Sequence, residues 1–194
     1  MRKTEEFCVE FTPQKSKTLS LISFLYDMVD SLKGAVVVAF FVFCFVFRVI
    51  GVEGDSMLPT LHDGDWVAVS GLSLNIDRGD VVISTQPWER NVPIVKRVIA
   101  VGGDTVDIDF STGNVFVNGE ILNEPYINSP TTLSYDVTFP LTVPDGCVFL
   151  MGDNRGNSLD SRSSQVGFID ERYILGEVYL RIFPTGDWKI DDYE

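Results

Sequence analysis

The chain has 194 residues, of which 45% are hydrophobic, and a net charge of −13. This length allows one domain of ordinary size with an appendage, and the apolar content is that of a folded protein rather than a disordered one. Residues 51–194 hold 23 acidic and nine basic side chains, an excess that argues against a nucleic-acid-binding surface.

Residues 1–33 predict a cytoplasmic segment that ends in an amphipathic juxtamembrane helix. Apolar side chains recur there at helical spacing, which is typical of a helix lying on a membrane face. The residues in this pattern are Leu19, Ile22, Leu25, Tyr26, Val29 and Leu32.

Residues 34–52 predict a transmembrane helix. The run "GAVVVAFFVFCFVF" carries no charge, and taken on to Val52 it reaches about 28 Å as a helix, close to the ~30 Å hydrocarbon core. Arg48 then snorkels to the headgroups. A buried core helix would have a polar face, and a cleavable signal peptide would place its apolar core nearer the N-terminus.

Charge predicts the orientation of this helix. Five basic residues precede it, whereas the next basic residue after Arg48 is Arg78. The N-terminus is therefore expected in the cytoplasm and residues 53–194 outside, in a single-pass protein of the cell membrane. The basic residues that precede the helix are Arg2, Lys3, Lys15, Lys17 and Lys33.

Residues 53–194 predict a mainly β domain. β-Branched and aromatic residues occur in runs of four to eight, separated at close intervals by Gly, Asp, Asn and Pro. Turn signals predict hairpins with strands at Thr105–Phe110, Asn114–Val117 and from Ile121 onward. The proline-bearing stretch Gly119–Pro144 is expected to be an irregular excursion between strands.

The stretch "GDSMLPTL" places a candidate nucleophile, Ser56, just after the apolar run. A serine nucleophile needs a base, and His62 is the one histidine of the chain. It lies in "LHDGDW", which is typical of a solvated turn that would direct its side chain away from Ser56.

A lysine is the alternative base. After the apolar run the chain contains two lysines, of which Lys189 lies in a polar tail and Lys96 lies in "VPIVKRVIAV". In a strand, Lys96 shares a face with Ile94, Val98 and Ala100. Burial there would lower its pKa from about 10.4 toward neutrality, as a general base requires. The pattern is equally compatible with Lys96 snorkelling from an edge strand.

A second polar stretch favours the lysine base. "MGDNRGNSLDSR" follows an apolar run, and its interleaved arginines, aspartates, serines and asparagine residues suit a hydrogen-bonded scaffold that orients another group. It fails as a calcium loop because Arg155 stands where a ligand oxygen is needed.

In these blocks, together with "GDVV", "VKRVIAVGGDTV" and "GEVYLRIFP", the sequence resembles the bacterial type I signal peptidases, which are membrane-anchored Ser/Lys proteases. The resemblance implies a signal-peptidase-like β-fold. It also implies a Ser56 nucleophile that forms an acyl-enzyme, a Lys96 general base, and a Ser158 hydroxyl that orients the lysine. A structural salt-bridge set is implied at Arg97, Asp153, Asp160 and Arg162.

The same resemblance implies shallow apolar pockets for small residues at positions −1 and −3 of a signal peptide. By position, the lining residues are Val52, Met57, Leu61, Ile94 and Val95. Some family members carry a serine two residues before the nucleophile, whose hydroxyl helps to stabilise the oxyanion. Here that residue is Gly54. The expected oxyanion donors are therefore the Ser56 amide and the Gly54 backbone.

The sequence thus predicts a signal peptidase I that removes signal peptides from exported pre-proteins at the outer membrane surface. Signal peptides and membrane lipid are its expected partners, with no nucleic acid, metal or cofactor. Two alternatives remain at this point. One is a self-cleaving Ser/Lys protease related to the SOS repressors, which the apolar anchor and the lack of a helix-turn-helix disfavour. The other is a membrane-anchored β-domain that binds a partner without catalysis.

Overall fold

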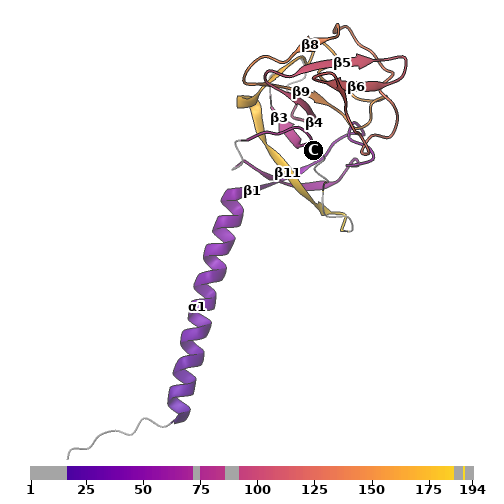
Figure 1. Ribbon diagram of the computed structural model, residues 1–194. Coiled ribbons are helices and arrows are strands. Elements are labelled where there is room, and N and C mark those ends of the chain that lie inside the picture. The colour runs from indigo at the N-terminus through magenta and orange to yellow at the C-terminus, as the bar shows by residue number, and fades with distance from the viewer. Residues whose placement is uncertain (1–16, 72–74, 86–91, 186–189, 191–194) are drawn as a thin grey trace, which may run out of the picture. The chain divides into compact units, whose positions relative to one another are not determined.

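The structure, a computed structural model, describes residues 17–71, 75–85, 92–185 and 190, apart from the side chains of residues 17–20 and 42–46. It divides into two units, Met1–Cys44 and Phe45–Glu194 (Figure 1). Three of the basic residues on which the predicted orientation depends, Arg2, Lys3 and Lys15, lie outside the described residues.

One helix, α1 (Lys17–Val46), contains both the expected amphipathic segment and most of the apolar run. It ends before the expected boundary at Val52, because Phe47–Gly51 forms strand β1 instead. Aromatic and β-branched residues favour an extended backbone, and β1 pairs along its whole length with Trp66–Ser70. The expected helix over 34–52 is therefore corrected, and the β unit begins earlier than residue 53.

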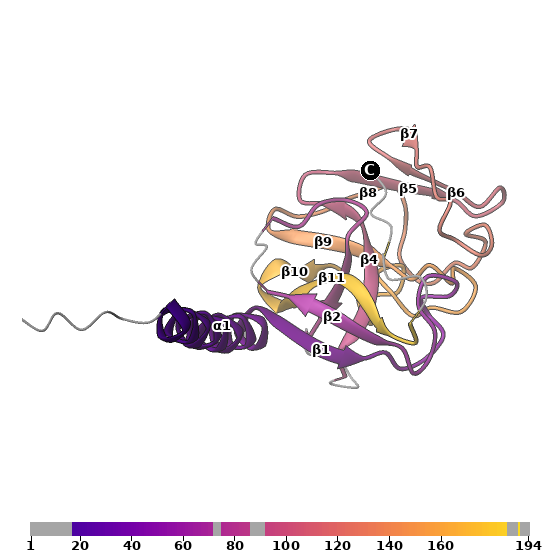
Figure 2. The same cartoon turned by 90° about the horizontal axis from the view of Figure 1, so that it is seen from below.

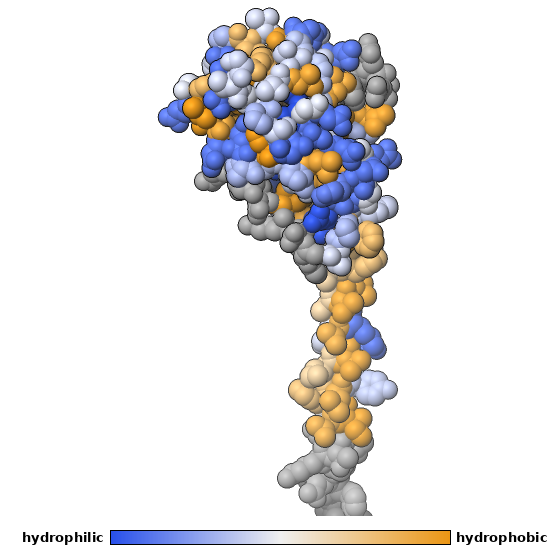
Figure 3. All heavy atoms as spheres, turned by 90° about the vertical axis from the view of Figure 1, so that its right-hand side faces the viewer, coloured by the Kyte–Doolittle hydropathy of each residue, from blue (hydrophilic) through white to orange (hydrophobic). Residues whose placement is uncertain are grey.

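Residues 21–41 of α1 are exposed. On the face of the molecule shown in Figure 3, most of the described side chains of this helix are apolar. Within the described part of the chain, no helix is both long enough and apolar enough to cross a lipid bilayer.

The second unit is built from two antiparallel sheets, as the sequence predicted for a mainly β domain. The seven-stranded sheet has the order β1-β2-β11-β3-β4-β9-β10, and the four-stranded sheet has the order β7-β6-β5-β8. Figure 2 shows β1, β2 and β11 side by side in the larger sheet. The further strands are β2 (Trp66–Ser70), β3 (Val81–Ser84), β4 (Ile94–Val101), β5 (Thr105–Asp109), β6 (Asn114–Val117), β7 (Glu120–Ile121), β8 (Leu141–Thr142), β9 (Cys147–Met151), β10 (Ile169–Asp170) and β11 (Ile174–Phe183), and a 3-10 helix, η1, spans Glu171–Tyr173.

The hairpins of the smaller sheet confirm the predicted turns. Asn118 and Gly119 both have positive φ, of 54° and 84°, between β6 and β7. This is the conformation that Asn-Gly favours in a two-residue hairpin turn. The predicted strand bounds agree with the structure to within a residue. The expected excursion over Gly119–Pro144 is shorter in the structure: residues 122–140 carry no helix or strand, whereas β7 and β8 occupy the two ends of the expected range.

Strand β4 lies between β3 and β9 and carries the core on both of its faces. The expected alternation of its side chains holds as far as Val98, which packs in the same cluster as Ile94. A register shift against β9 between Val98 and Ala100 then interrupts it, so that Ile99 and Ala100 enter the same apolar cluster. The bulge corrects the expected placement of Ala100 on the face of Lys96.

Candidate active site

Ser56 lies in the loop that joins β1 to β2. The ends of this loop are held together, because the Val52 N–H donates to the Asp65 carbonyl at 2.7 Å and the Gly64 N–H donates to the Val52 carbonyl at 2.9 Å. Met57, which follows Ser56, is buried in the core. This burial anchors the loop and leaves the Ser56 side chain half-buried at its surface.

Lys96 extends from β4 to this loop. Its Nζ lies 2.7 Å from Ser56 Oγ and 2.8 Å from the Val95 carbonyl oxygen. Only 4% of the residue is exposed. Among the described residues Lys96 forms no ion pair, so the expected alternative of a lysine snorkelling into solvent does not describe this arrangement.

Burial is also the main influence on the ionisation of Lys96. Desolvation lowers the pKa of Lys96 from its ordinary value to about 8, because an ammonium ion loses its hydration in this site. The negative charges of Asp160 and Asp153 oppose this effect and raise the pKa. The result is an amine whose pKa lies closer to neutral pH than that of an ordinary lysine, within hydrogen-bonding distance of an alcohol. A general base and its nucleophile need this arrangement.

Arg97 and Asp153, two members of the expected salt-bridge set, form an ion pair. Both side chains are fully buried, and the guanidinium donates to the two carboxylate oxygens at 3.0 and 2.8 Å. Asp153 also accepts from the Thr60 hydroxyl at 2.5 Å, which ties the serine loop to the strand that carries Lys96.

Asp160 and Arg162, the other two members of the expected set, form a second ion pair, which is also fully buried. The guanidinium donates to the two Asp160 oxygens at 2.8 and 2.9 Å, and to the backbone carbonyls of Leu133 and Arg155 at 3.0 Å each. Asp160 in turn accepts the Gly152 N–H at 3.0 Å. These bonds give the loop between β9 and β10 a fixed shape around the site.

A third buried pair, Arg155 with Glu124, was not predicted from the sequence. The Arg155 guanidinium donates to both Glu124 oxygens, at 3.0 and 2.5 Å, and to the Thr131 hydroxyl at 2.7 Å. The Tyr126 ring lies 4.1 Å below the Arg97 guanidinium and 6.0 Å from that of Arg155, in cation–π geometry. The excursion is thereby held against the loop that follows β9.

Ser158 is brought to this site but does not form the expected bond. Its Oγ is buried and has no hydrogen-bond partner within the described residues. A Cβ added at Gly152 would meet both Ser158 Oγ and the Ser56 carbonyl oxygen, so these two groups flank Gly152 closely. An orienting role of Ser158 toward Lys96 stays a prediction.

Gly54 also differs from its expected role. Its backbone N–H donates to the Asp63 carboxylate at 2.8 Å, so the hydrogen expected to face an oxyanion is already bonded. Gly54 adopts a φ of +85°, a conformation that favours glycine, and the space around an added Cβ is open.

A hollow of about 550 Å³ lies beside Ser56 and Lys96. Four of the five expected pocket residues line it, whereas the fifth, Leu61, is fully buried in the core and does not. The lining that was not predicted includes Ile50, Ile83 and Leu159. The expected residues that line the hollow are Val52, Met57, Ile94 and Val95.

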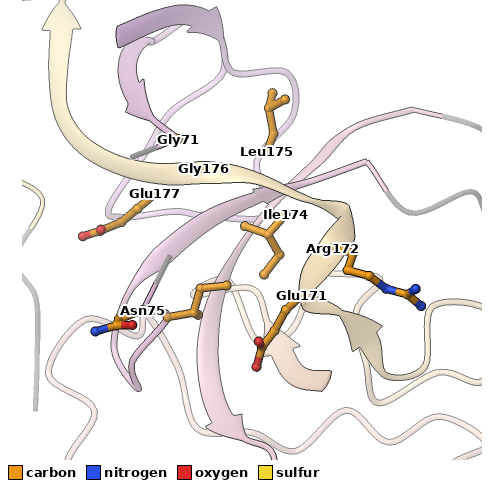
Figure 4. Close-up of a pocket in the computed structure, with 9 residues that line it drawn as sticks. Gly71, Asn75, Glu171, Arg172, Ile174, Leu175, Gly176 and Glu177 are labelled. Atoms are coloured by element: carbon orange, nitrogen blue, oxygen red, sulfur yellow. The ribbon is translucent and has the colours of Figure 1, made fainter. Parts of the chain in front are cut away.

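A different hollow, shown in Figure 4, is formed by η1, the start of β11 and residues near Gly71. Glu171 and Glu177 both line it. None of the residues predicted for the site contributes to this hollow, so the two are distinct.

Comparisons with known proteins identify the family. The family model described as "Signal peptidase, peptidase S26" matches residues 25–183. A signal peptidase I of Bacillus licheniformis is 36% identical over 178 residues, covering 87% of this chain and 94% of the relative. A probable signal peptidase I of Synechocystis is 34% identical, covering 90% and 91%. The chain belongs to the signal peptidase family. The predicted resemblance is confirmed.

A crystal structure of a signal peptidase I from Enterococcus faecalis is also similar to this chain. The two are 30% identical, with a TM-score of 0.45 over 53% of this chain and 96% of the other.

In this signal peptidase family member, the one histidine takes no part in the site. The His62 side chain is exposed, and its backbone N–H donates to the Asp65 carboxylate at 2.9 Å, in the turn that the sequence indicated. Arg155 belonged to the polar stretch singled out from the sequence, but its partner Glu124 comes from the irregular excursion, where no pattern indicated it.

Proposed function

We propose that this signal peptidase family member is a serine endopeptidase that removes N-terminal signal peptides from exported pre-proteins. In this proposal Ser56 is the nucleophile and Lys96 the general base. The 2.7 Å separation between Ser56 Oγ and a buried Lys96 Nζ carries the proposal. Membership of the family supports the signal peptide as the substrate.

The reaction begins with a neutral lysine. With a pKa of about 8, roughly a tenth of Lys96 is uncharged at pH 7. The neutral amine accepts the Ser56 hydroxyl proton as Oγ attacks the scissile carbonyl, which gives a tetrahedral oxyanion. As the intermediate collapses, the Lys96 ammonium returns that proton to the departing amine and an ester with Ser56 remains. Water, deprotonated by Lys96, then attacks the ester, and Lys96 passes the proton to Ser56 Oγ as the signal peptide leaves with a new carboxylate.

The buried ion pairs support this chemistry by fixing the groups around Lys96. Arg97, the neighbour of Lys96 on β4, is held by Asp153 through two bonds, and Asp153 also accepts from Thr60 in the serine loop. A displacement of one ångström would reduce the rate markedly, because proton transfer needs hydrogen-bonding distance. We include in this proposal that Ser158 orients the lysine when substrate fills the site.

The apolar hollow beside the dyad is proposed to select small residues at positions −1 and −3 of the signal peptide. Val52, Met57, Ile94 and Val95 line it. We propose that their β-branched and thioether side chains form an apolar surface next to Ser56 that fits small residues of the substrate better than large ones. The hollow is open to solvent on one side, as access for a polypeptide requires.

We further propose that the N-terminal segment holds the chain at the cell membrane, with the catalytic unit outside and the N-terminus in the cytoplasm. The uncharged apolar run and the basic residues before it support this. From Gly34 to its end at Val46, α1 rises only about 20 Å, so a span would need to include the turns before Gly34. The ion pair of Lys33 with Asp30, at 3.2 Å, would reduce the cost of placing those two charges near the interface.

The experiment that tests the catalytic proposal incubates the full chain, in detergent, with a pre-protein that carries a signal peptide. Mass spectrometry maps the cut. The wild type is expected to release one mature product whose −1 and −3 residues are small. The Ser56→Ala and Lys96→Ala variants are expected to fold and to release none. Near-normal turnover in either variant would refute the roles of Ser56 and Lys96. If the wild type releases no product, the alternative of a β-domain that binds a partner without catalysis would be favoured.

A further inference from the structure

Asn154 contacts the backbone on both sides of the nucleophile. Its own N–H donates to the Ser56 carbonyl at 3.0 Å, and its side-chain Nδ2 donates to the Asp55 carbonyl at 2.9 Å. The Asp55 carbonyl also accepts the Leu58 N–H, at the longer distance of 3.3 Å. Asn154 is therefore joined to two successive peptide units around Ser56.

The Asp55 carbonyl and the Ser56 N–H belong to one peptide unit. A trans peptide is planar, so its C=O and N–H point in opposite directions, and fixing one end fixes the direction of the other. Within the described part of the chain, the Ser56 N–H forms no hydrogen bond. A donor to the carbonyl also polarises the N–H at the opposite end of the unit.

We propose that Asn154 is a positioning residue that aims and polarises the Ser56 amide as the oxyanion donor, an inference that rests on the proposed function. The amide is important here because the neighbouring Gly54 N–H is bonded to Asp63 and Gly54 has no side-chain donor. The geometry leaves the Ser56 amide to meet the negative charge that develops in the tetrahedral intermediate.

Asn128 fixes which way the Asn154 amide faces. Its Nδ2 donates to Asn154 Oδ1 at 3.0 Å. A primary amide has one acceptor end and one donor end, so a donor at the Oδ1 end leaves the NH₂ directed at the Asp55 carbonyl. The excursion after β7, which carries Asn128, is therefore linked to the peptide before Ser56 through the Asn154 side chain.

The test compares Asn154→Ala with wild type on a signal-peptide substrate, with the full chain in detergent. The Ala variant keeps the backbone bond to the Ser56 carbonyl, so the loop should hold its place. The Leu58 bond to the Asp55 carbonyl also remains, so the expected loss is smaller than that of removing an oxyanion donor. We expect kcat to fall about tenfold, KM to stay within about twofold, and the acidic limb of the rate profile to stay at the wild-type pH.

A peptide aldehyde provides the readout that a general structural defect would not mimic. The Ser56 hydroxyl adds across its C=O to form a hemiacetal, whose oxygen occupies the oxyanion position. The aldehyde is expected to bind Asn154→Ala about tenfold more weakly than wild type. A peptide with an unreactive amide in place of the aldehyde should bind both proteins equally.

A second pair of variants tests the orientation of the amide without changing Asn154. Asn128→Asp places an acceptor at the Oδ1 end, which favours a flipped Asn154 whose oxygen faces the Asp55 carbonyl. We expect Asn128→Asp to lower kcat more than Asn128→Ala. Asn123→Asp, which adds the same charge to an exposed position of the same excursion, should leave kcat unchanged.

Several outcomes would overturn the inference. An Asn154→Ala enzyme with kcat within twofold of wild type would do so, as would a kcat loss accompanied by a shifted acidic limb or by undiminished aldehyde affinity. If Asn154→Ala does not fold, equal kcat values for Asn128→Asp and Asn128→Ala would overturn the inference instead. Failure of the wild type to cleave, or cleavage by Ser56→Ala, would instead refute the proposed function.

Discussion

Replacing Asp160 by Asn should weaken the fold and, at the same time, make Lys96 easier to deprotonate. The change removes the charge from a fully buried ion pair with Arg162. Breaking such a pair costs about 3–5 kcal/mol, and the lower value is expected because Arg162 keeps two carbonyl acceptors at 3.0 Å. A domain stable by about 5–15 kcal/mol survives this loss. With an m-value of about 2 kcal/mol/M, the urea midpoint should fall by about 1.5 M.

The effect on catalysis has the opposite sign. Desolvation lowers the pKa of Lys96 to about 8, and of the two carboxylates that oppose it, Asp160 has the larger effect. Its removal leaves desolvation less opposed, so the pKa falls further and the neutral base is present at lower pH. The acidic limb of kcat/KM should move to lower pH than in the wild type.

The assay is the pH dependence of kcat/KM for signal-peptide cleavage, measured with a urea titration of the same preparations. Glu120→Gln removes one negative charge from an exposed strand of the smaller sheet and is the matched control, for which neither quantity should change. If Asp160→Asn folds and its acidic limb stays in place or moves to higher pH, Lys96 is not the group that controls the limb.

Three further predictions follow from the buried groups of the site. Lys96→Met should stabilise the protein by up to about 3 kcal/mol below pH 8, because the pKa of Lys96 falls from 10.5 in the unfolded chain to about 8 in the folded one. The free energy of unfolding of the wild type should therefore rise with pH between these two values. Urea titrations should show that the advantage of Lys96→Met over wild type vanishes above about pH 10.5. Gly152→Ala should abolish cleavage even in folded protein, since the new methyl group would overlap the Ser56 carbonyl oxygen, and near-normal cleavage would contradict this packing. Glu124→Gln should lower the free energy of unfolding by about 3 kcal/mol because it leaves Arg155 buried with its charge uncompensated, and an unchanged thermal midpoint would show that the pair contributes nothing.

Local signals were enough to predict much of the second unit. The turn at Asn118 and Gly119 follows from backbone preferences that any hairpin shares, so the strands around it could be placed to within a residue. The burial of Lys96 was one of two interpretations that its aliphatic neighbours allowed, since the strand pattern is equally compatible with a lysine that snorkels from an edge strand. These features depend on residues close together in the chain.

Features set by distant partners could not be predicted in the same way. Phe47–Gly51 continues an apolar run, and pairing with β2 makes it a strand rather than the end of a helix. The bulge at Val98–Ala100 depends on the register of β9, some fifty residues on along the chain.

The surroundings of the dyad show the same limit. The resemblance indicates which side chains form the salt-bridge set, although not that Arg97 pairs with Asp153 and Arg162 with Asp160. It does not indicate that the Gly54 N–H donates to Asp63, or that Glu124, in an irregular segment, pairs with Arg155. These contacts join loops whose conformations no periodic pattern encodes.

The most direct test of the central claim is the titration of the Lys96 side chain itself. Carbon-13 labelling of lysine in the full chain, in detergent, gives NMR signals whose shifts follow deprotonation, and the Lys96→Met variant identifies the signal that belongs to Lys96. We predict that this signal titrates near pH 8, well below the ordinary value for a lysine side chain. A Lys96 signal that titrates above about pH 10, as a free lysine side chain does, would contradict the account of a buried amine acting as the base for Ser56.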